Sequence, residues 1–78
     1  MTDYKPIDCG LHSEYELAIM QHCRLHLTWQ GRDGVVHMEI IMPTDLYTRQ
    51  GEEFIIISRA DGSTGEIRLD HIIRYRRA

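Results

Sequence analysis

Apolar and polar residues alternate with a period of two through two neighbouring stretches of the chain. Residues 23–30 place an apolar side chain at every second position, and residues 36–42 repeat this pattern. Such alternation is typical of β-strands with one buried face. The Gly-Arg-Asp-Gly segment at 31–34 has the composition of a tight turn, so the pattern predicts a β-hairpin.

The second half of the chain predicts further short strands. The Pro-Thr-Asp segment at 43–45 should break or bend the strand before it, because proline cannot donate to a β-ladder. Residues 46–50 are ambiguous, and Gly51 marks a turn. Residues 54–57 are apolar on both faces, as in a central strand covered on two sides. The remaining expected elements are a hairpin turn at 60–63, a strand at 66–69, an interruption at 70–71 and a last short strand at 72–75.

One helix is predicted before the strands. Ser13 and Glu16 have the spacing of a capping box, in which each side chain satisfies the other residue's backbone amide, and the apolar positions that follow predict a helix over 13–22. Its start could also lie earlier, near Asp8 or Leu11. Residues 1–12 are expected to be an extended lead-in, because Pro6 disfavours helical geometry in the residue before it.

These elements predict a single domain of class mainly β (α+β). The chain of 78 residues is enough for one compact domain. We expect a lead-in over 1–12, a helix over 13–22 and a small antiparallel β-barrel over 23–78, because closure would remove the exposed edges of short, bent strands. The pattern fits an Sm-like or an OB-like barrel equally well.

Charge is divided unevenly along the chain. Residues 1–53 contain four basic and nine acidic side chains, whereas residues 54–78 contain five basic and three acidic ones, for a net charge of −3 overall. Nucleic-acid-binding proteins normally present a net basic face. The acidic balance therefore favours a basic protein surface as partner and leaves Tyr75 among Arg74, Arg76 and Arg77 as the best candidate patch for RNA. The alternative for both charge groups is ordinary solvated surface.

The chain also indicates where the protein works. It contains no apolar run of the roughly 20 residues that cross a bilayer, and its first residues lack the features of a secretory signal. We therefore expect a cytoplasmic protein without membrane attachment, with Cys9 and Cys23 as reduced thiols rather than a disulfide. It is expected to be monomeric when free.

No motif predicts catalysis or a metal site. His22, Cys23 and His26 are close in sequence, but the strand pattern begins at Cys23 and would break their helical spacing. Cys9 near His12 resembles a nucleophile and base only in residue type, without a glycine-rich oxyanion loop. We expect a protein that is not an enzyme and that has no catalytic residues, no metal and no cofactor.

Four short pieces of the sequence, in order over nearly the whole chain, resemble the Rho-binding antiterminator family. They are Tyr4-Lys5-Pro6-Ile7-Asp8-Cys9; Glu16-Leu17-Ala18 followed by Gln21-His22; Asp45-Leu46, Arg49 and Glu53-Phe54; and Glu66-Ile67-Arg68-Leu69-Asp70-His71-Ile72. The resemblance implies an Sm-like barrel with an N-terminal helix. It also implies a partner, the transcription terminator Rho, whose N-terminal RNA-binding domain such proteins obstruct.

The resemblance implies which residues contact Rho. The helix and its lead-in contribute His12, Ser13, Glu14 and Glu16, and the loop before the central strand contributes Arg49 and Gln50. We add Asp8 and Asp45 on electrostatic grounds, since a groove that binds RNA is basic and an acidic surface complements it. The sequence thus predicts an inhibitor of transcription termination that blocks RNA loading onto Rho, with an Sm-like RNA-binding module as the alternative.

Overall fold

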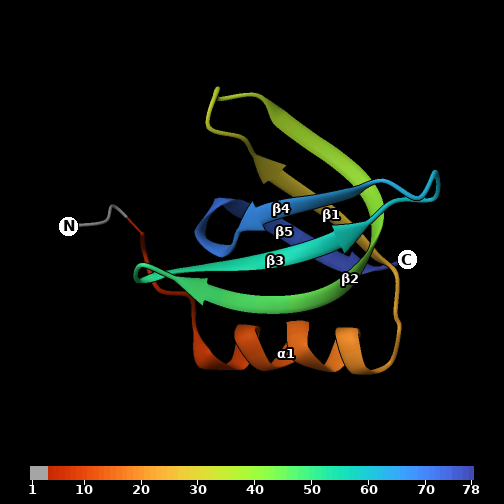
Figure 1. Ribbon diagram of the computed structural model, residues 1–78, viewed down its shortest axis with the longest axis horizontal. Coiled ribbons are helices and arrows are strands. Elements are labelled where there is room, and N and C mark those ends of the chain that lie inside the picture. The colour runs from red at the N-terminus through yellow and green to blue at the C-terminus, as the bar shows by residue number, and fades with distance from the viewer. Residues whose placement is uncertain (1–3) are drawn as a thin grey trace.

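The computed structural model describes residues 4–78, which form one helix and one five-stranded antiparallel sheet (Figure 1). The predicted mainly β class is confirmed. The elements are α1 (Cys9–Met20), β1 (Leu25–Gln30), β2 (Val36–Arg49), β3 (Glu52–Ser58), β4 (Thr64–Arg68), a 3-10 turn η1 (Leu69–His71) and β5 (Ile72–Arg77).

The sheet has the strand order β4-β3-β2-β1-β5 and is organised around the long strand β2. Residues 36–41 of β2 pair with β1, and residues 42–49 pair with β3. The register shifts between Pro43 and Asp45, so the proline bends the strand without ending it. Figure 1 shows β2 curving from the hairpin that it forms with β1 down to the layer formed with β3.

The sheet is not closed. β4 and β5 are its two edge strands, and the ladders recorded for residues 4–78 contain no pairing between them. The closed barrel expected from the sequence is therefore absent from the described residues. What the structure establishes is one helix packed on an open, strongly bent sheet, with η1 as the interruption predicted at 70–71.

The helix begins earlier than Ser13, at the alternative start near Asp8. Asp8 is extended (φ −60°, ψ 140°) and its carbonyl accepts the His12 amide at 3.0 Å, but its side chain makes no capping hydrogen bond. The predicted capping box is wrong, because Ser13 lies within the helix. The longer helix places Leu11 and Tyr15 on one face with Ala18, and this spacing gives it a continuous stripe against the core.

The predicted lead-in is correspondingly shorter than 1–12. Residues 4–8 have no regular secondary structure, and residues 1–3 of the lead-in lie outside the described residues. At the other end α1 stops at Met20, before the predicted end at 22. The amides of His22 and Cys23 bond back to the carbonyls of Ile19 and Ala18, and His22 adopts a left-handed φ of 51°. This is the Schellman arrangement that terminates many helices.

The core lies between α1 and the concave face of the sheet. β1 begins at Leu25 rather than at the predicted Cys23, although Cys23 still packs against the core. β3 is an interior strand, paired with β2 and β4 on its two sides, and its apolar run is mostly buried as expected, whereas the centre of the sheet is β2. The buried hydrophobic side chains that form the main cluster are Tyr15, Ala18, Leu25, Leu27, Trp29, Ile41, Ile55, Ile57, Ile67 and Leu69.

The predicted turns are confirmed. Gly34 and Gly62 have φ values of 81° and 87° in the β1–β2 and β3–β4 turns, and Gly51 has a φ of 79° between β2 and β3. Gln50 before it also has a positive φ of 51°, so the β2–β3 connection is a two-residue turn with both residues left-handed. Within residues 4–78, no helix is long and apolar enough to span a membrane.

Candidate protein-binding groove

An acidic groove runs between α1 and the second half of β2. It has a volume of about 390 Å³. Its lining combines apolar and polar side chains from α1, β2 and β3, namely His12, Glu16, Ile19, Met20, Asp45, Leu46, Tyr47, Thr48 and Glu53. We call this the α1–β2 groove. It brings together three of the predicted contact residues, His12, Glu16 and Asp45, from segments far apart in the sequence.

His12 holds the two sides of the groove together. Its Nδ1 lies 2.7 Å from a carboxylate oxygen of Glu16, one turn further along α1, and its Nε2 lies 3.0 Å from a carboxylate oxygen of Glu53 on β3. Because each ring nitrogen faces a carboxylate, both contacts are charge-assisted hydrogen bonds when the imidazole is protonated. His12 therefore links α1 to β3. The groove keeps an excess of negative charge, because it contains three carboxylates and one histidine.

The N-terminal segment supports this wall of the groove. The Tyr4 hydroxyl donates to Glu53 at 3.4 Å. Burial, followed by the nearby carboxylate of Glu53, raises the pKa of Tyr4 to about 12. Tyr4 is thus a neutral donor at physiological pH and holds one oxygen of the Glu53 carboxylate, while His12 contacts the other.

Asp45 reaches the groove because of the bend in β2. It lies at the register shift after Pro43, is exposed, and accepts the Leu46 amide at 2.8 Å through Oδ1. A bulge re-aims the side chains around it. The proline that was predicted to disturb the strand therefore has a positional role: it turns this carboxylate toward α1.

Glu14 lies on the other flank of the helix. Its carboxylate accepts a hydrogen bond from the Tyr75 hydroxyl on β5. Burial, followed by this bond to Glu14, raises the pKa of Tyr75 to about 12. The Tyr75 ring in turn packs edge-on against Tyr15, with 5.1 Å between ring centroids. Glu14 and Glu16, which the sequence treats as one acidic patch, therefore face different surroundings.

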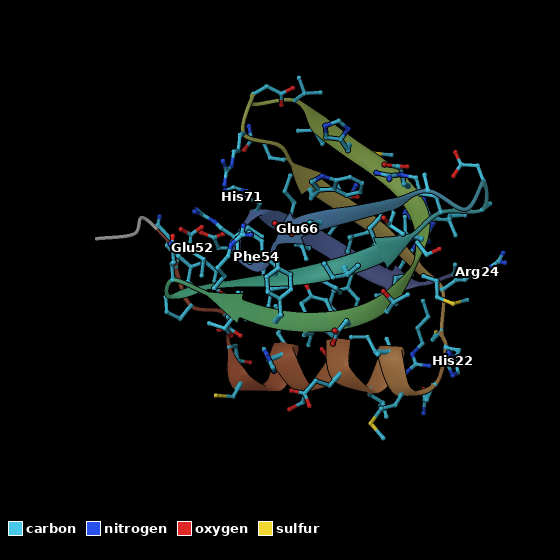
Figure 2. All side chains as sticks on the ribbon, viewed as in Figure 1. His22, Arg24, Glu52, Phe54, Glu66 and His71 are labelled. Carbon is cyan, nitrogen blue, oxygen red and sulfur yellow. The ribbon has the colours of Figure 1, made fainter. Side chains whose placement is uncertain are left out.

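The other predicted contact residues do not line the groove. Asp8 and Ser13 are exposed at the start and on the outer side of α1. Arg49 lies on the opposite face of β2, where its guanidinium covers the Phe54 ring at 5.1 Å and pairs with Glu66 at 3.4 Å. Gln50 occupies the left-handed turn that follows. Figure 2 shows Glu52, Phe54, Glu66 and His71 gathered at the end of the sheet opposite His22 and Arg24.

A largely buried ion pair, with side chains 9% and 8% exposed, anchors the N-terminal segment to the end of β4. Both guanidinium contacts of Arg68 with Asp70 are short, 2.6 Å from Nε and 2.9 Å from Nη2, and the Lys5 amide donates to Asp70 at 3.1 Å. Burial acts to raise the pKa of Asp70, but the bonds from Arg68 and Lys5 outweigh it and lower that pKa overall. Arg68 also contacts Glu52 at 3.0 Å. The network ties the segment before α1 to the end of β4.

Sequence reasoning missed two residues that shape the groove. Glu53 stood within a quoted motif but was not assigned to the site, because alternation along β3 does not reveal that it faces His12. Tyr4 is the first residue of another quoted motif, but no role was predicted for it. The Arg68–Asp70 pair could have been predicted, because opposite charges two residues apart at a strand end can form a local bidentate contact. From the sequence, Asp70 was assigned only to a turn.

The described residues contain no cluster of three or more His, Cys, Asp or Glu side chains able to hold a metal ion. Cys9 is exposed and Cys23 half-buried, and both are free thiols. His12, the base considered for Cys9, instead faces two carboxylates.

No protein-family model matches the chain, and no curated protein matches it at a significant level.

Proposed function

We propose that this protein is a cytoplasmic inhibitor of Rho-dependent transcription termination, acting as a binding protein and not as an enzyme. In this proposal it docks on the N-terminal RNA-binding domain of Rho and blocks RNA loading. The sequence resemblance suggests the partner. The observation that carries the proposal is the α1–β2 groove, in which His12, Glu16 and Asp45 meet and Glu53 adds a further carboxylate.

The chemistry of the groove supports an acidic protein contact. A surface that binds RNA is rich in cationic side chains, and carboxylates presented on a protein can occupy the same positions as phosphates. The apolar side chains of Ile19 and Leu46 in the lining provide area to bury between such pairs. In the same proposal, the helix followed by five bent antiparallel strands is an Sm-like fold.

A competition assay tests this function. Purified Rho with a labelled cytidine-rich RNA is titrated with the protein at two salt concentrations. Displacement of RNA from Rho, without RNA binding by the protein itself, is the expected result. If RNA remains on Rho and binds the protein directly, the alternative of an Sm-like RNA-binding module replaces the proposal.

Single neutralisations locate the contact surface. Because Glu16 and Asp45 line the groove whereas Glu14 faces β5, Glu16→Gln and Asp45→Asn are expected to weaken Rho binding by about tenfold each, and Glu14→Gln by less. Asp33→Asn is the matched control: it removes one charge in the exposed β1–β2 turn and keeps an oxygen to accept the Val35 amide. Equal effects of all four variants would show that only net charge matters, and would exclude the groove as the docking site.

A further inference from the structure

The convex face of the first half of the sheet is basic and apolar. The register aligns His26 of β1 with Ile40 and Arg76, and Thr28 with Met38 and Arg74. Side chains directly opposite one another in antiparallel strands share a face. We define the sheet face by the side chains that lie on this side of the three strands, with the small Thr28 buried among the others: His26, Thr28, Gln30, Val36, Met38, Ile40, Arg74 and Arg76.

This face has two distinct stripes. Along β2, Val36, Met38 and Ile40 are 53%, 60% and 56% exposed. Along β5 the exposed Arg74 and Arg76 form no ion pair with any described residue. No carboxylate belongs to the sheet face. Exposed apolar area of this kind, bordered by uncompensated cations, is typical of an interaction surface for an acidic, apolar partner.

The same chain carries a surface of the complementary kind. Along α1, Leu17 is 44% and Met20 75% exposed, with Ser13 between the exposed carboxylates of Glu14 and Glu16. We call these five residues the helix face. Their helical spacing groups Ser13, Leu17 and Met20 in a line with one glutamate on each side. Each carboxylate already has one partner, Tyr75 or His12, and Glu16 and Met20 also line the α1–β2 groove. The helix face contains no cationic side chain.

Charge decides which pairs of surfaces can meet. Two sheet faces would place arginines against arginines, and two helix faces would place glutamates against glutamates. Only the combination of a helix face with a sheet face sets apolar residues against apolar residues and carboxylates against guanidinium groups. Single-stranded RNA fits the sheet face less well. Tyr75 borders the hollow that the sheet face forms around Arg74 and Arg76, but its ring packs against Tyr15 and its hydroxyl bonds to Glu14, so it offers no open surface on which a base could stack.

We propose that the protein self-associates head to tail, with the helix face of one copy on the sheet face of a second copy. This contact is heterologous, so a bound pair still presents one free surface of each kind and further copies can add. The arrangement differs from the monomer expected from the sequence. It also has a consequence for the proposed function, because a helix covered by a second copy cannot engage Rho at the same time.

Sedimentation velocity over a range of protein concentrations, without Rho or RNA, tests the inference directly. The average mass is expected to rise with concentration and to fall back toward that of the monomer at high salt, because the charge pairs are at an exposed interface. A monomer at all concentrations and in low salt would overturn the proposal and would leave the Rho competition assay unaffected.

Charge-swapped variants test the geometry. Arg74→Glu on the sheet face and Met20→Lys on the helix face are each expected to weaken self-association by about tenfold or more. An equimolar mixture of the two variants is expected to restore self-association. In the mixture the lysine of Met20→Lys meets the glutamate of Arg74→Glu, and the unmodified helix face of one variant meets the unmodified sheet face of the other. Arg32→Glu, the same charge reversal in the exposed β1–β2 turn, is the matched control and should associate like the unmodified protein.

Three outcomes would contradict this head-to-tail contact. If both single variants associate as strongly as the unmodified protein, the assigned surfaces are wrong. If the mixture remains monomeric although circular dichroism shows both variants folded, the helix face and the sheet face do not contact each other. Binding of a labelled oligouridine to the unmodified protein, lost in Arg74→Glu without any self-association, would assign the sheet face to RNA instead.

Discussion

Tyr15 has a buried hydroxyl without a hydrogen-bond partner among the described residues. Its ring is 1% exposed in the middle of the core, where it packs edge-on against Tyr75. Burial, followed by the neighbouring Tyr75 and Glu14, raises the pKa of this hydroxyl well above its ordinary value. A buried polar group that has lost its water without gaining a partner costs free energy on folding.

Tyr15→Phe is therefore expected to stabilise the protein, by about 1 kcal/mol, because it removes the unsatisfied hydroxyl and keeps the ring. Urea denaturation followed by circular dichroism measures the free energy of unfolding. Tyr75→Phe is the control and is expected to bring no gain, since its hydroxyl bonds to Glu14. A loss of stability in Tyr15→Phe would indicate that the hydroxyl has a partner, such as a buried water molecule.

Asp70 links folding stability to pH. Its side chain is 8% exposed and its pKa is lowered in the folded protein, chiefly through Arg68 against the opposing effect of burial. The stabilisation is complete above the unfolded-state pKa of about 4 and is lost as the pH falls through the lowered folded-state pKa. Acid should therefore release the segment that carries Lys5 and leads into α1.

Asp70→Asn is expected to cost about 2–3 kcal/mol at neutral pH, because Arg68 keeps a buried charge with one counter-ion fewer. Below pH 4 the difference between the two proteins should shrink. Denaturation midpoints across a pH series measure this. A difference that stays constant down to pH 2 would mean that the lost contact is steric rather than ionic.

At the scale of elements, α1 shows where local signals compete. Both Asp8 and Ser13 have side chains suited to an N-cap. The capping-box pattern favoured Ser13, but packing of Leu11 and Tyr15 against the sheet selects the longer helix. Its C-terminus is set by the left-handed His22, a conformation that a glycine adopts at lower cost.

His22→Gly is thus expected to stabilise the protein by up to about 1 kcal/mol, since it removes the steric cost of a left-handed non-glycine residue. The matched control is Gln21→Gly, one residue earlier, where φ is −89° and glycine brings only extra chain entropy. Thermal unfolding should show opposite shifts for the two. If His22→Gly instead destabilises, the histidine side chain makes a contact that outweighs the backbone strain.

On the scale of the whole molecule, charge is separated onto opposite kinds of surface. The α1–β2 groove collects carboxylates, whereas the sheet face collects arginines. This separation follows the division of charge along the chain, because Glu16, Asp45 and Glu53 belong to the acidic stretch 1–53 and Arg74 and Arg76 to the basic stretch 54–78. Such a dipolar arrangement orients a protein as it approaches a charged partner.

For the proposed Rho complex, rising ionic strength is expected to slow association far more than it speeds dissociation, since screening weakens steering between exposed charges. Stopped-flow mixing of labelled protein with Rho at several salt concentrations measures both rates. Neutralising Glu53 as Glu53→Gln should reduce the salt dependence of association. If salt acts mainly on dissociation, the contact depends on buried ion pairs rather than on long-range attraction.

The sequence by itself predicted the first hairpin, the turns and the apolar strand β3, because these depend on alternation and glycine placement within a few residues, but it left residues 46–50, which include the end of β2, ambiguous. It also indicated one helix before the sheet and an acidic N-terminal half. Tertiary structure alone decided the helix boundaries, the openness of the sheet and the hydrogen-bond partners of each carboxylate. Glu14 and Glu16 are two residues apart, yet one bonds to Tyr75 and the other to His12. Pro43 signalled a bend in β2 locally, but the carboxylates that this bend and the docking of α1 bring together come from distant segments, which no local pattern encodes.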